Sequence, residues 1–301
     1  MKTLLIGCGN IANYYIQYFI NRNYQFSILS RTTKQIDDNA QDLLCSFYTS
    51  LDQVNLVSYQ NIIIASPIET LFDYTYYFLK NSNAYILCEK PGCIDENLMK
   101  LTEQSKGRLF YAFNRRFYKI VDRMKNYIQQ DFSEQMQIIA TIDERVLSVE
   151  SSKKSDLVKA RWMWANTTHP IDLVCYMYGY ENINMEEIET FTSGRGILPW
   201  HPSGNTFLAT ILNHKHSIIL YSLWNAFGGW SINVSTPSYT LNMPNLEKLN
   251  GPDFSHEEID NIKPGFSAML NSFYSKDFDR FCNLEQLMQL KKIVYKIGNY
   301  Q

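Results

Sequence analysis

Six residues near the N-terminus have the types and spacing of a phosphate-binding turn. The sequence Gly7-Cys8-Gly9-Asn10-Ile11-Ala12 follows the apolar run Thr3–Ile6 and precedes aromatic and aliphatic residues at helical spacing. In a strand–turn–helix unit the first glycine permits a tight turn, the second lets backbone approach a pyrophosphate, and a small third residue allows close helix packing. The N–H groups and dipole of the helix terminus favour the anion. A glycine turn without a ligand is the alternative. The residues expected to bind a dinucleotide are Gly7, Gly9, Asn10, Ile11 and Ala12.

The segment that follows the second apolar run bears on the choice of cofactor. An acidic residue there would accept a hydrogen bond from a free ribose 2′-hydroxyl. The sequence instead has Ser30, Arg31 and Thr32, and no acid before Asp37. A guanidinium can pair with a 2′-phosphate, and two hydroxyl groups flank it. NADP is therefore favoured over NAD, and a solvated loop arginine is the alternative.

Five further segments stand in a characteristic order and spacing after the glycine turn. They are Ile62-Ile63-Ile64-Ala65-Ser66-Pro67, Leu87-Cys88-Glu89-Lys90-Pro91, Phe113-Asn114-Arg115-Arg116-Phe117, His169-Pro170-Ile171-Asp172 and the closing Lys263-Pro264-Gly265-Phe266. Together with the glycine turn, these segments resemble the Gfo/Idh/MocA oxidoreductases, which are named for glucose–fructose oxidoreductase and inositol dehydrogenase. The resemblance covers most of the chain.

The resemblance implies roles for several of these residues. Lys90 would lie beside the nicotinamide and the reacting carbon, where an ammonium can hydrogen-bond a substrate oxygen and stabilise developing negative charge. Glu89 and Pro91 would hold its loop, with a cis peptide bond before Pro91. Ser66 and Pro67 would join Glu89 and Lys90 in contacting the cofactor.

A second catalytic residue implied by the resemblance is His169. As a general acid or base it would move a proton, a task that suits a near-neutral pKa. Asp172 lies three residues later, so both side chains can point the same way on a helix. The substrate contacts expected beside Lys90, His169 and Asp172 are Asn114, Arg116 and Trp162. A histidine that only packs on a sheet is the alternative for His169.

The sequence departs from the family pattern in three places. Ala165 stands where many members have an aspartate, and Leu71 where a histidine usually follows the Ser-Pro pair. Arg161-Trp162-Met163-Trp164 replaces a glycine-rich approach to the His169 helix. These departures keep open a non-catalytic NADP-binding regulator, although Lys90 and His169 argue against it.

Strands and helices alternate in the first part of the chain. Continuous apolar strands that alternate with helices indicate a parallel sheet covered on both faces, here an N-terminal Rossmann domain over 1–117. The expected strands are Thr3–Ile6, Phe26–Leu29, Ile62–Ala65, Tyr85–Cys88 and Arg108–Phe113, with an amphipathic helix over Glu69–Lys80.

From residue 118 to 301 the pattern changes to that of an α+β domain. Consecutive strands without intervening helices predict an open antiparallel sheet with an uncovered apolar face, and hence a homodimer or higher homo-oligomer. The terminal helices are candidates for returning to the first domain. Strands are expected at Met136–Ile142, Thr206–Leu212, Ser217–Leu223, Trp230–Val234 and Tyr239–Leu241, and helices at Phe117–Gln130, His169–Tyr178, Phe266–Phe281 and Leu284–Ile297.

Composition narrows the class further. The net charge is −2, without the clustered Lys and Arg of a nucleic-acid partner. No apolar run has the length of a membrane span or signal sequence, so a cytoplasmic location is expected. The cysteines lack a CxxC pair, so no metal site is expected there, and His214 and His216 are weak candidates for metal ligands.

The sequence predicts NADP-dependent hydride transfer on a small molecule, by resemblance a sugar, nucleotide sugar or polyol. An imine or enone reductase is the alternative among enzymes.

Overall fold

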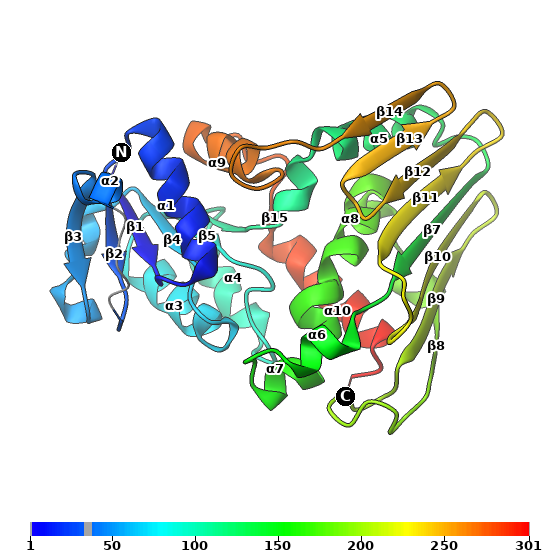
Figure 1. The fold of residues 1–301 in the computed structure, drawn as a ribbon, viewed down its shortest axis with the longest axis horizontal. Coiled ribbons are helices and arrows are strands. Elements are labelled where there is room, and N and C mark those ends of the chain that lie inside the picture. The colour runs from blue at the N-terminus through cyan, green and yellow to red at the C-terminus, as the bar shows by residue number, and fades with distance from the viewer. Residues whose placement is uncertain (1, 33–37, 301) are drawn as a thin grey trace. The chain divides into compact units, whose positions relative to one another are not determined.

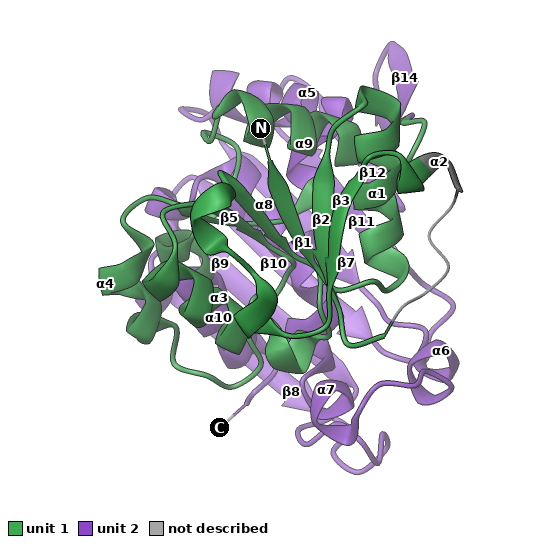
Figure 2. Cartoon of the chain, turned by 90° about the vertical axis from the view of Figure 1, so that its left-hand side faces the viewer, with its two compact units in different colours: residues 1–114, 260–287 green, residues 115–259, 288–301 purple. Residues whose placement is uncertain are grey.

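The computed structural model describes residues 2–32 and 38–300, so Asp37 lies outside the described residues. The chain forms two compact units (Figure 2). Unit 1 comprises residues 1–114 and 260–287, and unit 2 comprises 115–259 and 288–301. The sequence predicted a domain boundary after residue 117. In the structure, the first segment of unit 1 ends at Asn114, and the segment 260–287 also belongs to unit 1.

Unit 1 contains a seven-stranded sheet in the order β15-β6-β5-β4-β1-β2-β3. Strands β1 to β6 are parallel, and the short β15 pairs antiparallel with β6. This order reverses between β1 and β4, which is the switch point where Rossmann sheets bind ligands beyond the carboxyl ends of their strands. The strands are β1 (Thr3–Ile6), β2 (Phe26–Leu29), β3 (Leu44–Tyr48), β4 (Asn61–Ile64), β5 (Tyr85–Cys88), β6 (Leu109–Tyr111) and β15 (Cys282–Asn283).

The helices of unit 1 connect these strands (Figure 1). They are α1 (Asn10–Arg22), α2 (Asp38–Gln41), α3 (Ile68–Asn81), α4 (Thr102–Ser105) and α9 (Phe266–Ser275), with 3-10 turns at Leu51–Gln53, Leu56–Ser58 and Leu98–Leu101 and another that starts at Asn114. Helix α9 was expected to continue to Phe281, and that expectation was wrong. Lys276 adopts the left-handed conformation with φ 61° and ends the helix, and Phe278 then stacks on Phe110 at 4.0 Å. Helix α10 (Leu284–Ile297) begins in unit 1 and continues in unit 2.

Unit 2 contains an eight-stranded sheet in the order β14-β13-β12-β11-β7-β10-β9-β8. Neighbouring strands are antiparallel except β10 and β7, which are parallel, so the sheet is mostly rather than entirely antiparallel. The predicted fold class is confirmed by the two sheets. The strands are β7 (Met136–Ile142), β8 (Ile188–Ser193), β9 (Thr206–Leu212), β10 (His216–Leu223), β11 (Trp230–Ser235), β12 (Thr240–Pro244), β13 (Lys248–Gly251) and β14 (Phe254–Glu257).

Helices α5 (Lys119–Gln130) and α8 (Thr168–Tyr178) pack on one face of this sheet (Figure 1). Strand β9 shows the consequence, because Phe207, Ala209 and Ile211 are buried while Leu208 and Leu212 are exposed. The remaining helical segments are α6 (Val146–Glu150), α7 (Asp156–Ala160), a π-helix at Met163–Thr167 and 3-10 turns at Tyr180–Asn182 and Met185–Glu187. Among the described residues, no helix combines the length and apolarity needed to cross a membrane.

Candidate functional site

The glycine turn has the geometry of an anion-binding site. Gly7 has φ +102°, and a Cβ atom there would lie 2.6 Å from the carbonyl oxygen of Ala65, so only glycine fits. A Cβ atom at Gly9 would meet no protein atom within 4 Å. Helix α1 begins at Asn10 with no side-chain cap and no acidic residue in its first turn. Its first N–H groups therefore have no side-chain acceptor from the cap, as an anion site requires.

Ser30, Arg31 and Thr32 directly follow β2. The Ser30 N–H donates to Tyr48 O at 3.0 Å, and its hydroxyl donates to Thr32 O at 3.0 Å. These bonds fix a tight turn in which Arg31 and Thr32 are exposed. The turn thus presents a guanidinium to solvent at the end of β2, the strand next to β1.

The Ser-Pro pair follows β4 and starts α3. Thr70 Oγ1 bonds to the Ser66 hydroxyl at 2.9 Å and to Pro67 O at 2.8 Å, which holds the turn against the helix. Leu71, one of the departures from the family pattern, is 1% exposed and belongs to the core of unit 1.

The loop after β5 carries Glu89, Lys90 and Pro91. The Lys90–Pro91 peptide bond is cis, as predicted. The Tyr15 hydroxyl donates to Glu89 Oε1 at 2.7 Å. Burial of the carboxyl raises the pKa of Glu89, and the Tyr15 hydrogen bond and the positive charges of Lys263 and Lys90 oppose that rise. The loop therefore holds Lys90 beside an enclosed carboxyl group.

The segment that contains Lys263 lies near Glu89, and the sequence did not indicate this position. Asn114, an expected substrate contact, donates from Nδ2 to Pro264 O at 2.9 Å and so holds the backbone of this segment. The Phe266 ring packs 4.7 Å from that of Tyr15, and the Lys263 ammonium lies 5.3 Å from the Tyr14 ring. The Lys-Pro-Gly-Phe sequence was the signal, but nothing in it indicated that Lys263 would lie near Glu89.

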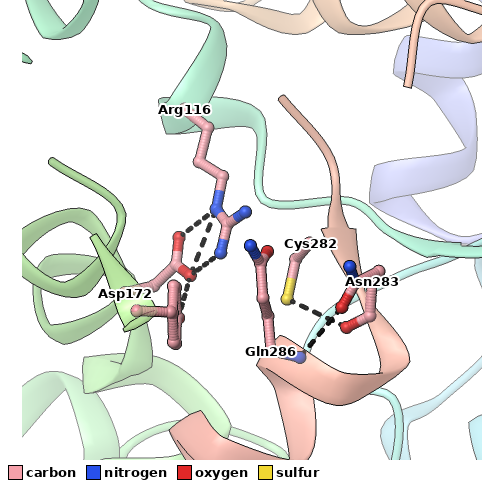
Figure 3. Close-up of polar contacts among 6 residues, drawn as sticks. Arg116, Asp172, Cys282, Asn283 and Gln286 are labelled. Carbon is pink, nitrogen blue, oxygen red and sulfur yellow. Dashed lines mark hydrogen bonds and ion pairs between the residues drawn. The ribbon is translucent and has the colours of Figure 1, made fainter. Parts of the chain in front are cut away.

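In unit 2, Arg116 and Asp172 form a buried ion pair (Figure 3). Arg116 Nε and Nη2 lie 2.9 and 2.6 Å from the carboxylate oxygens, and the side chains are 0% and 1% exposed. The Tyr180 hydroxyl also donates to Asp172, at 2.7 Å, and the Tyr176 and Tyr180 rings flank the guanidinium. Both residues were expected to contact substrate. Their mutual pairing connects the start of unit 2 to α8.

His169 is the second residue of α8 and is partly exposed. Its ring lies 6.0 Å from that of Trp230, the first residue of β11, over which the Arg115 guanidinium lies at 5.4 Å. Asp172, expected to point the same way as His169 on this helix, pairs with Arg116 and Tyr180. Trp162, also a predicted substrate contact, is partly exposed just before the π-helix. Trp230 and Arg115 are thus neighbours of His169 that the sequence did not single out.

The described residues include no group of three or more His, Cys, Asp or Glu side chains that could hold a metal. His216 lies with Nδ1 3.0 Å from the Tyr178 hydroxyl and Nε2 3.0 Å from Phe132 O, so the fold occupies both ring nitrogens. All six cysteines are free thiols.

The predicted residues divide between the units. His169, Asp172, Arg116 and Trp162 belong to unit 2. The residues in unit 1 are Gly7, Gly9, Asn10, Ile11, Ala12, Ser30, Arg31, Thr32, Ser66, Pro67, Glu89, Lys90 and Asn114. Within unit 1, three loops leave one edge of the sheet: Gly7 N donates to Leu29 O, Ala65 N to Ile6 O and Glu89 N to Ile64 O, at 2.8–2.9 Å.

Comparison with known proteins supports the reading of unit 1. The family model for Gfo/Idh/MocA proteins, an oxidoreductase family with an NAD-binding Rossmann fold, matches residues 1–110. No curated protein sequence matches the chain.

Solved structures share the fold over the full length. The dehydrogenase MviM from Clostridium difficile is 15% identical, with 100% of this chain and 99% of that chain covered and a TM-score of 0.74. A myo-inositol dehydrogenase from Corynebacterium glutamicum is 16% identical, with 99% and 94% covered and a TM-score of 0.68. The WlbA dehydrogenase from Bordetella pertussis, solved with NADH and UDP-GlcNAcA, is 12% identical, with 99% and 94% covered and a TM-score of 0.71.

Proposed function

Because residues 1–110 match the family model of the Gfo/Idh/MocA oxidoreductases, we propose that the chain transfers hydride reversibly between NADP(H) and a hydroxyl or carbonyl carbon. The observation that carries the proposal is the arrangement at one edge of the unit 1 sheet. The glycine turn after β1 and the cis Lys90–Pro91 loop after β5 leave the same edge, on strands separated only by β4. A dinucleotide with its pyrophosphate at α1 would bring its nicotinamide toward that loop.

In the proposed reaction, a bound nicotinamide supplies or accepts the hydride. Lys90 donates a hydrogen bond to the substrate oxygen and stabilises the negative charge that develops there. His169 gives that oxygen its proton during reduction and removes it during oxidation. Arg116 and Asp172 would act by holding α8, and Asn114 by holding the Lys263 segment.

The proposed substrate is a sugar, nucleotide sugar or related polyol. The myo-inositol dehydrogenase and the WlbA complex with UDP-GlcNAcA have this fold and support that class. Trp162 and Trp230 offer indole rings on which a sugar ring could pack. An imine or enone reductase is a second candidate among enzymes. Ala165 and Leu71 motivate a third reading, a regulator that binds NADP without turnover.

NADP is the proposed cofactor because of the turn after β2. Arg31 is exposed there between Ser30 and Thr32, and no acidic residue stands at these three positions to accept the hydrogen bond of a free 2′-hydroxyl. A guanidinium offers paired donors that match a phosphate.

A second copy of the chain is proposed to cover the open face of the unit 2 sheet. Phe191, Leu208 and Tyr221 lie in register on neighbouring strands and are 58%, 37% and 45% exposed. Light scattering at micromolar concentration is expected to give a dimer or larger species. Leu208→Asp should dissociate it, because a charge in an apolar interface is costly to bury. A monomeric wild type would contradict this proposal.

The catalytic assignment is tested by Lys90→Ala and His169→Ala. A screen of sugars and nucleotide sugars by NADPH absorbance first identifies a substrate. Each variant should then lose a factor of about 100 or more in turnover, the loss expected when a transition-state donor or a general acid is removed. NADPH affinity should change little in Lys90→Ala, because the glycine turn and α1 hold the pyrophosphate.

Unchanged turnover in both variants would show that these residues are not the catalytic pair. Tight NADPH binding without turnover of any compound would favour the regulator instead.

A further inference from the structure

We propose that Glu144 is a positioning residue for His169, which it holds in place through the π-helix that precedes α8. The inference rests on the proposed function, in which His169 moves the proton. Glu144 lies two residues beyond β7 and is 6% exposed. Neither the sequence motifs nor the family resemblance singled it out.

The contacts of Glu144 lie just before His169 in sequence. Its carboxylate accepts a hydrogen bond from Thr167 Oγ1 at 2.6 Å, and Asn166 Nδ2 donates to both oxygens at 3.1 and 3.2 Å. Thr167 is fully buried. A buried carboxylate with several donors is held in one geometry, because any move leaves a charge or a donor unsatisfied.

These donors belong to an unusual stretch of helix. Met163–Thr167 is π-helical, and α8 follows at Thr168 without a break. A π-turn carries an extra residue per turn, is rare and is frequently found at functional sites. Its relaxation to α-helix would change the rotation between the segments on either side by about 100°, the angle of one helical residue. Glu144 binds the last two residues of this stretch and thereby opposes that change.

A second tie holds the other side of His169. His169 thus lies between two residues whose side chains are bonded to distant parts of unit 2. Thr167, two residues before it, bonds to Glu144, and Asp172, three residues after it, bonds to Arg116 and Tyr180. Trp230, whose ring lies 6.0 Å from His169, pairs in register with Ile142, two residues before Glu144. Glu144 therefore follows the same end of β7 that pairs with Trp230, the residue beside the His169 ring.

The test uses Glu144→Ala, Glu144→Gln and Thr167→Val in the full-length protein. Thr167→Val keeps the shape and removes the 2.6 Å bond. Glu144→Gln keeps an acceptor for Thr167. The expected result is a fall in kcat of at least tenfold in Glu144→Ala, partial rescue in Glu144→Gln and an intermediate loss in Thr167→Val, with unchanged NADPH affinity. The His169 ring resonance, assigned by its absence in His169→Ala, should shift in Glu144→Ala. Glu150→Gln, an exposed glutamate on α6, is the matched control.

The decisive variant is the double substitution Glu144→Ala/His169→Ala. If Glu144 acts through His169, the double variant loses no more turnover than His169→Ala, whereas independent effects multiply. Multiplied losses, or a His169 resonance that Glu144→Ala leaves in place, would overturn the inference. The proposed function fails separately, if His169→Ala turns over like the wild type, and the resonance can still be measured in that case.

Discussion

The candidate residues of the two units are held in different ways. In unit 1 the glycine turn, the Ser-Pro pair and the Glu89-Lys90-Pro91 loop are short segments that directly follow β1, β4 and β5. In unit 2, His169 is held by ties between residues distant in sequence: Arg116 to Asp172, 56 residues apart, and Glu144 to Thr167, 23 apart. A parallel sheet aligns its own loops, whereas a helix above a mixed sheet needs side chains to fix its position. Local sequence motifs therefore predict the first arrangement but not the second.

The two units also differ in the titrating group that each encloses. Burial raises the pKa of Glu89 in unit 1, whereas in unit 2 burial, with help from the positive charge of Arg161, lowers the pKa of His201 to about 4. The neutral form is favoured in both cases. The consequences for stability have opposite signs, because one group loses and the other gains a charge as the pH falls.

The largest expected effect comes from breaking the ion pair of unit 2. Arg116→Met should destabilise unit 2 by about 3–5 kcal/mol, because it leaves the carboxylate of Asp172 buried without its cation. Urea unfolding and amide hydrogen exchange of α8 would measure the loss. In Arg116→Met/Asp172→Leu the buried charge is gone, and part of the stability should return.

Cofactor affinity is the control for that prediction. If unit 1 builds the cofactor site from its own loops, NADPH should bind the folded Arg116→Met protein as it binds the wild type. An equal loss of stability in the single and double variants would mean that the ion pair matters only as packing.

The next effect depends on pH. His201 Nε2 lies 2.9 Å from the Tyr300 hydroxyl, and its ring packs against Phe207 and Trp224. With a folded pKa of about 4 against 6.5 unfolded, the stability that the neutral ring contributes is present above pH 6.5 and is lost as the pH falls toward 4. The full difference is about 3 kcal/mol by linkage. Thermal unfolding between pH 7 and 4 should show a shallower loss in His201→Gln.

His214→Gln is the matched control, because His214 is exposed in the hairpin between β9 and β10. It should keep the wild-type pH profile. A His201→Gln profile that also follows the wild type would mean that other groups cause the acid sensitivity.

Sequence patterns predicted central strands better than edge strands. β1, β2, β5, β7 and β9 have the predicted bounds, because continuous or alternating burial leaves a clear apolar pattern. The expected strands did not include β3, β8, β13, β14 or β15. Of these, β3, β8, β14 and β15 end their sheets. Edge strands such as β14, with the sequence Phe-Ser-His-Glu, are largely exposed and carry no periodic signal.

The candidate site residues also divide into those with a clear local sequence pattern and those without one. The glycine turn was predictable because its motif is contiguous in the sequence, and the family resemblance implied the cis peptide bond before Pro91. The burial and pairing of Arg116 with Asp172 were not predictable, because the two residues lie 56 positions apart in the sequence. Glu144 and Lys263 could not be found from spacing, since their partners lie 22 or more residues away.

The smallest expected effect separates two functions within unit 1. NADPH should bind the wild type at least tenfold more tightly than NADH, about 1.4 kcal/mol, and Arg31→Ala should remove that preference by weakening NADPH alone. Gly9→Ala is the matched variant. A methyl group there meets no protein atom within 4 Å, so the fold should be unaffected, while the approach of a pyrophosphate common to both cofactors is obstructed. Gly9→Ala should therefore weaken NADPH and NADH by the same factor, and fluorescence titration of both cofactors would show it. Equal affinities in the wild type would remove the NADP preference. A Gly9→Ala protein that binds both cofactors normally would place the pyrophosphate elsewhere. It would also contradict the proposal that unit 1 holds its ligand by local backbone alone.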